Sequence, residues 1–107
     1  MQPDQVNRMM QEYAKMQKGM ERVQKELGES TVEGSSGGGV VKITCTGTFD
    51  FRSVRITKEA VDPEDVDTLE DLVLTAIKDA CIKAQELGQK KMTAITANLQ
   101  LPPGMGF

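Results

Sequence analysis

Apolar side chains recur along the first part of the chain at alternating intervals of three and four positions. This spacing places them on one face of an α-helix, so we predict a helix over about residues 4–27 with a continuous apolar seam. Such a helix is about 36 Å long, more than a small sheet can cover, so part of its seam needs another chain and we expect a homodimer. The seam comprises Val6, Met9, Tyr13, Met16, Met20, Val23 and Leu27.

The middle of the chain, about residues 30–57, predicts a small antiparallel sheet of three strands. Residues 30–34 form a short first strand, and the glycine-rich segment 34–39 is a flexible hinge or turn. Residues 40–46 alternate between apolar and polar positions, as expected of a half-buried strand, and residues 49–56 return beside them.

The return strand breaks strict alternation, because Phe49 and Phe51 are odd-numbered whereas Val54 and Ile56 are even-numbered. A bulge at residues 52–53 would bring all four side chains onto one face, and this is our preferred interpretation. A three-residue loop over 46–48 would then pair Phe49 with Cys45 and Phe51 with Ile43.

The last part of the chain predicts a second long helix over about residues 67–92. Asp67, followed by Glu70, resembles a capping box, and Gly28 earlier in the chain is the expected stop of the first helix. We expect an irregular tail over residues 93–107, because it ends in Leu-Pro-Pro-Gly-Met-Gly-Phe. The fold class is therefore α+β, in the order αβββα. The core-facing stripe of the second helix comprises Leu69, Leu72, Val73, Ala76, Ile77, Ala80, Ala84 and Leu87.

Composition narrows the chemistry that a single domain of 107 residues can perform. The chain has no histidine, so it lacks the commonest general base and metal ligand, and Cys45 and Cys81 do not form a zinc motif. Buried free thiols are favoured over a disulfide between these two cysteines, although their spacing does not exclude one. No apolar run is long enough to span a membrane. We therefore expect no enzyme, metal, cofactor, small-molecule substrate or membrane partner, and a cytoplasmic location.

Charge is unevenly distributed although the net charge is only −3. Residues 59–87 carry nine acidic and two basic side chains, so the excess acid lies in one segment. The five cations of the first helix instead lie on the side opposite its apolar seam. This stripe suits a row of phosphates, but it equally suits a helix face that is simply solvated, and the sequence favours the solvated face. The stripe comprises Arg8, Lys15, Lys18, Arg22 and Lys25.

An ordered set of short motifs resembles the YbaB/EbfC family of bacterial nucleoid-associated proteins over nearly the whole chain. The first helix is rich in Met, Gln and Lys, and the spacing of Ala76, Asp79 and Ala80 in the second helix fits. The other motifs are Gly-Gly-Gly-Val-Val-Lys at 37–42, Thr-Gly at 46–47, Arg-Ser-Val-Arg-Ile at 52–56, Asp-Thr-Leu-Glu-Asp-Leu-Val at 67–73, Lys-Met at 91–92 and Leu-Pro-Pro-Gly at 101–104.

This resemblance implies a tweezer-like homodimer with a shared central sheet and helical arms, which binds duplex DNA in the nucleoid with little sequence preference and alters its conformation. The implied DNA-binding residues are the five cations of the first helix together with Lys83, Lys90 and Lys91. A second functional class stays open: a dimeric adaptor that uses its Met-rich seam and Pro-Pro-Gly tail to bind another protein.

Overall fold

The computed structural model describes residues 3–98, with the side chains of residues 3–95. It confirms the predicted αβββα order of two long helices with a three-stranded antiparallel sheet between them. The elements are α1 (Pro3–Glu29), β1 (Thr31–Ser36), β2 (Val41–Thr46), β3 (Phe51–Ile56), a short 3₁₀ helix η1 (Lys58–Ala60) and α2 (Val66–Asn98).

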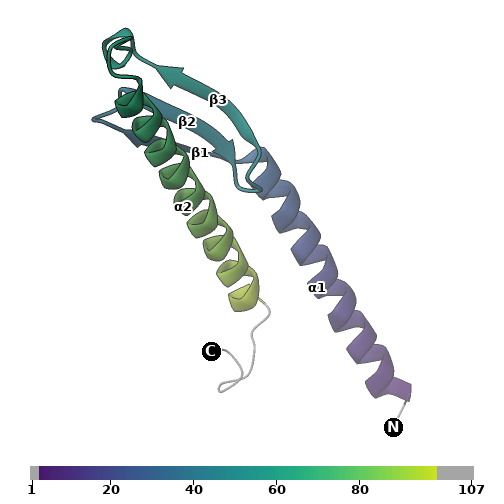
Figure 1. Cartoon of the computed structure of the whole chain (residues 1–107). Helices are drawn as coiled ribbons and strands as arrows, with labels where there is room; N and C mark the ends of the chain where they lie inside the picture. The colour runs from purple at the N-terminus through teal and green to yellow at the C-terminus, as the bar shows by residue number, and fades with distance from the viewer. Residues whose placement is uncertain (1–2, 99–107) are drawn as a thin grey trace.

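The molecule is elongated, with principal extents of 74 × 25 × 17 Å. In the strand order β1-β2-β3, β2 is central and β3 is an edge strand. The first part of α2 lies across β1 and β2, its later part runs beside α1, and the N-terminal part of α1 projects beyond the end of α2 (Figure 1).

The core lies between β2 and α2. Alternate β2 side chains point toward the helix, and three alanines one turn apart on α2 let the helix approach the sheet closely. The three alanines are fully buried and lie on the predicted core-facing stripe of the second helix. The core comprises Val41, Ile43, Cys45, Ala76, Ala80 and Ala84.

Gly34 marks the closest approach of β1 to α2. A Cβ atom at this position would lie 2.4 Å from both the Ala76 carbonyl oxygen and the Ala80 amide nitrogen, so a side chain cannot be accommodated. Gly34 therefore lies inside β1, which continues to Ser36, whereas the sequence predicted that the strand ends at Gly34 and that a flexible glycine-rich segment begins there. The turn itself spans only residues 37–40, where Gly37, Gly38 and Gly39 have positive φ angles.

Two polar contacts beside Gly34 fix β1 on α2. The Ser35 backbone N–H donates to the Asp79 carboxylate at 2.9 Å, and the Ser36 hydroxyl donates to the Leu72 carbonyl oxygen at 2.6 Å. The hydrogen bond from Ser35, together with the ammonium group of Lys83, holds the pKa of Asp79 below its usual value. This carboxylate therefore anchors the first strand to the second helix.

The predicted bulge lies where we expected it, because Arg52 is the unpaired extra residue of β3. The predicted register was wrong: Cys45 pairs with Phe51 instead of Phe49, and Ile43 pairs with Val54. The reason is that the loop spans residues 47–50, with Phe49 in the left-handed region at φ 65°.

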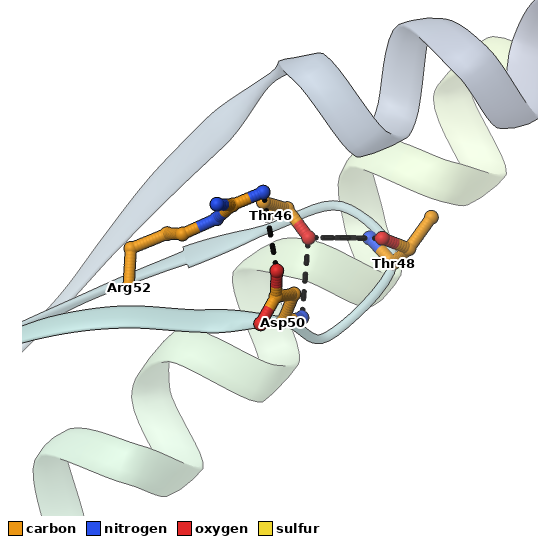
Figure 2. Close-up of polar contacts among 4 residues, drawn as sticks. All are labelled: Thr46, Thr48, Asp50 and Arg52. Atoms are coloured by element: carbon orange, nitrogen blue, oxygen red, sulfur yellow. Dashed lines mark hydrogen bonds and ion pairs between the residues drawn. The ribbon is translucent and has the colours of Figure 1, made fainter.

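The buried Thr46 hydroxyl organises this longer loop (Figure 2). Its oxygen accepts hydrogen bonds from the backbone N–H groups of Thr48 at 3.3 Å and Asp50 at 3.1 Å. The Asp50 carboxylate forms an ion pair with Arg52 at 3.1 Å. A side-chain oxygen that satisfies two loop amides explains why the loop is longer than the sequence predicted.

Both helices extend beyond their predicted ends. In α1, Gly28 does not terminate the helix, which continues to Glu29, and the Ser30 amide and hydroxyl both donate to the Glu26 carbonyl oxygen. In α2, the predicted irregular tail is helical over residues 93–98, and the rest of that tail lies outside the described residues.

The side chain that caps α2 is Asp65 and not the predicted Asp67. Its carboxylate accepts hydrogen bonds from the Thr68 backbone N–H at 3.4 Å and from the Thr68 hydroxyl at 2.6 Å. Asp65 directly precedes the first helical residue, Val66, so its carboxylate occupies the N-cap position and satisfies a free N–H of the first turn.

Candidate nucleic-acid interface

Part of the cationic stripe of α1 lies beside α2, although its side chains are exposed. Lys15, Lys18 and Arg22 line a hollow of about 450 Å³ between α1 and α2, and Lys91 enters the same hollow from α2. The apolar part of its lining comes from Gly19, Val23, Ala94 and Ile95, and its one acidic residue is Glu26. Four cations from two helices are thus gathered around one concave surface with a single carboxylate.

Gly19 allows the two helices to pass close to each other at this hollow. The residue is buried, and a Cβ atom there would lie 3.7 Å from Ile95 of α2. The contact of α1 with α2 therefore includes Gly19, which lies beside the apolar seam, as well as Val23, which belongs to the seam. The contact at Gly19 brings part of the cationic stripe toward α2.

An ion pair connects the two helices across the hollow. Lys91 donates to the Glu26 carboxylate at 3.2 Å, and both side chains are partly exposed. A partly exposed pair of this kind is screened by solvent and contributes little to stability. Breaking the ion pair therefore costs little free energy, so an anion in the hollow can compete with Glu26 for the ammonium group of Lys91.

The other predicted cations lie elsewhere. Arg8 and Lys25 do not line the hollow, and Lys90 is exposed on α2. Lys83 is already engaged, because its ammonium group contacts Asp79 at 3.0 Å and donates to the Glu33 carbonyl oxygen at 2.9 Å. The structure thus brings together four of the eight predicted DNA-binding residues.

Sequence reasoning missed two cations of the sheet. Lys42 on β2 and Arg55 on β3 are directly opposite each other and exposed, on the face of the sheet that α2 does not cover. The alternation over residues 40–46 already placed Lys42 on the polar face, but the incorrect register concealed that Arg55 lies beside it.

The apolar seam of α1 is buried only at its C-terminal end, at Val23 and Leu27. Its five remaining residues are exposed in the single chain, with Tyr13 at 64% and Met9 at 60%, and the neighbouring Met10 is exposed with them.

A second uncovered apolar surface lies beside β3. Phe51, Val54 and Ile56 pair with the core residues of β2 and therefore share their face, yet they are 45%, 54% and 40% exposed because α2 does not extend over β3. Leu74 of α2 is exposed next to this strand. The predicted apolar face of the hairpin is present for Phe51, Val54 and Ile56, but Phe49, which we also expected on it, lies in the loop. The β3 part of this face has no cover within the chain.

The described residues carry little other chemistry. Within residues 3–98, no group of three or more His, Cys, Asp or Glu side chains is placed to hold a metal ion. Cys45 and Cys81 are free thiols, and burial together with the nearby Cys81 raises the pKa of Cys45. No helix in the described part of the chain is long and apolar enough to cross a membrane.

Comparison with known proteins identifies relatives that match over most of the chain. A nucleoid-associated protein of Moorella thermoacetica is 47% identical over 97 residues, covering 91% of this chain and 93% of the relative. One from Pelotomaculum thermopropionicum is 43% identical, covering 91% of this chain and 92% of the relative. The crystal structure of an uncharacterized Helicobacter pylori protein shares the fold, with a TM-score of 0.67 at 18% identity, over 91% of this chain and 97% of that one. Residues 1–99 match the sequence profile of the YbaB/EbfC DNA-binding family, and the chain belongs to that family.

Proposed function

We propose that this protein is a DNA-binding component of the bacterial nucleoid, located in the cytoplasm, that holds duplex DNA mainly by its phosphates and alters its conformation. Its family and the names of its relatives support DNA as the partner. The observation that carries the finer proposal is the hollow between α1 and α2, where Lys15, Lys18, Arg22 and Lys91 surround one carboxylate.

The chemistry of the hollow favours phosphates over base edges. Its polar groups are long cationic side chains on two helix surfaces, which neutralise phosphate charge without reading sequence. This explains how a chain of net charge −3 can bind a polyanion: its excess acid is concentrated in residues 59–87, and three of the four cations, Lys15, Lys18 and Arg22, belong to a different helix. We therefore expect little sequence preference and a strong dependence on salt.

We propose that the functional form is a homodimer. The edge strand β3 exposes Phe51, Val54 and Ile56 on the face that packs in the core, and its outer backbone groups have no neighbouring strand. Packing these side chains against the same surface of a second copy would bury them. Pairing between edge strands of the two copies would satisfy the free backbone groups. The two pairs of helices would then project from one central sheet.

A dimeric adaptor that binds another protein is the second candidate function. The observation in its favour is the exposed apolar patch at the N-terminal part of α1, formed by Val6, Met9, Met10, Tyr13 and Ala14. Flexible methionine side chains suit a protein-binding surface. The cations of the hollow have no role in this alternative, so charge substitutions distinguish the two.

The decisive experiment compares two double variants of the same helix. K15Q/R22Q removes two cations that line the hollow, whereas R8Q/K25Q removes two cations of the stripe that do not. Glutamine preserves helix propensity, so both variants should fold. If each lost phosphate contact flattens the slope of log K against log salt by about 0.9, K15Q/R22Q should flatten it by up to about 1.8 and R8Q/K25Q by much less. Equal effects of the two variants would contradict a role specific to the hollow, and no effect of either would contradict DNA binding by α1.

A further inference from the structure

The face of the sheet opposite α2 carries an unusual pair of like charges. Lys42 and Arg55 are direct cross-strand partners on β2 and β3, and both are exposed. Directly opposite side chains in an antiparallel sheet have Cβ atoms about 5 Å apart, so two cations in these positions repel each other.

The neighbours of this pair do not neutralise it. Among the described residues, no ion pair links Lys42 or Arg55 to a carboxylate, and the cross-strand neighbour of Lys42 on β1 is Ser35. Asp50, the acidic residue of the adjacent loop, is engaged by Arg52 (Figure 2). Glu33 is one row away, opposite Thr44.

We propose that Lys42 and Arg55 form a second contact for the phosphates of duplex DNA, on the open face of the sheet and separate from the hollow between the helices. The inference rests on the proposed function, since it assumes that the chain binds DNA. Lysine, arginine and small hydroxyl side chains are the groups that proteins use to contact phosphates, and Ser53 and Thr44 occupy the next row of this face. A phosphate between the two cations would relieve the repulsion that the free sheet tolerates.

A single substitution separates this contact from a solvated face. Lys42→Glu would place opposite charges across the two strands, which favours the sheet instead of opposing it. We expect the thermal midpoint of the free protein to rise or stay the same while DNA affinity falls. A solvated face would show the same stability with unchanged affinity, which would overturn the proposal.

The full test measures the salt dependence of duplex binding for K42Q/R55Q, for K15Q/R22Q in the hollow, and for the variant that combines all four substitutions. The control is Lys78→Gln, which removes an exposed cation of α2. The proposal predicts that K42Q/R55Q flattens the slope by up to about 1.8, that the control does not, and that the effects of the two double variants add.

The outcomes distinguish the proposed sheet contact from DNA binding through the hollow. If K42Q/R55Q folds normally and binds with the wild-type slope while K15Q/R22Q weakens binding, the sheet contact is refuted and DNA binding through the hollow survives. If K42Q/R55Q alone flattens the slope, the sheet contact stands and the hollow is refuted. If Lys78→Gln, with one cation removed, flattens the slope by about half as much as K42Q/R55Q, the response reflects total charge, and the sheet contact is refuted.

Discussion

Replacement of Gly34 by alanine should be the most damaging small substitution in this fold. The added Cβ would lie 2.4 Å from backbone atoms of Ala76 and Ala80, whereas an ordinary contact begins near 3.4 Å. Because the obstructing atoms belong to the helix backbone, β1 and α2 must separate by about 1 Å. A gap of that size forfeits a quarter to a half of the dispersion energy of each contact along the interface.

Separation would also stretch the two hydrogen bonds that directly follow Gly34, from Ser35 to Asp79 and from Ser36 to Leu72. Overpacking typically costs about 1–3 kcal/mol, and the cost is at the upper end where no side-chain movement can relieve it. We expect Gly34→Ala to lower the free energy of unfolding by about 3 kcal/mol, measured by urea denaturation at a fixed protein concentration.

Gly88→Ala is the matched control, because a Cβ at that position of α2 meets nothing within 4 Å. Alanine is the better helix former by up to about 1 kcal/mol, so this variant should be neutral or more stable than the wild type. A Gly34→Ala variant within about 0.5 kcal/mol of the wild type would refute the reasoning, because ordinary surface substitutions already fall in that range.

Three further predictions concern the arms, the anchor and the edge strand. Gly19→Ala should stabilise the protein by up to about 1 kcal/mol in thermal unfolding, because its Cβ would make an ordinary 3.7 Å contact with Ile95; destabilisation would show that the helices pass more closely. The folded-state pKa of Asp79 is lowered, so its stabilising contribution is present above the unfolded value of about 3.8 and is lost as pH falls through the lower folded value. Asp79→Asn should therefore destabilise the protein at neutral pH and flatten its acid unfolding curve, and an unchanged curve would contradict the anchor. Val54→Glu should dissociate the proposed homodimer, because it places an unpaired charge in the interface, and a variant that sediments as a dimer would exclude β3 from the interface.

The sequence predicted the elements of this fold well, because strong periodicity determined them. The apolar seam of α1 and the core-facing stripe of α2 repeat with the period of a helix, and the alternation of β2 repeats with the period of a strand. The ends and the register were less predictable. Gly28 remained helical because Ser30 continues the hydrogen bonding, and the β2–β3 register shifted because Phe49 adopts a left-handed conformation that its residue type does not favour.

The cations that line the hollow were among the candidates that the sequence offered, but their arrangement could not be predicted. Heptad geometry placed the cations of α1 opposite its seam, but it could not show that α2 packs beside Gly19, so that three of these cations line a hollow between the helices. That arrangement depends on the approach angle of α2, whose contact residue Ile95 lies 76 positions after Gly19. The pairing of Lys42 with Arg55 likewise depends on the bulge at Arg52 and on the loop length.

The most direct test of the central claim is the salt dependence of wild-type binding to two duplexes of unrelated sequence. If Lys15, Lys18, Arg22 and Lys91 all contact phosphates, log K should fall with log salt at a slope of about −3.6 from one hollow, and more steeply when further contacts engage. The two duplexes should give similar affinities and the same slope. A slope near zero, or affinity confined to one of the duplexes, would contradict the account and require an element that reads bases.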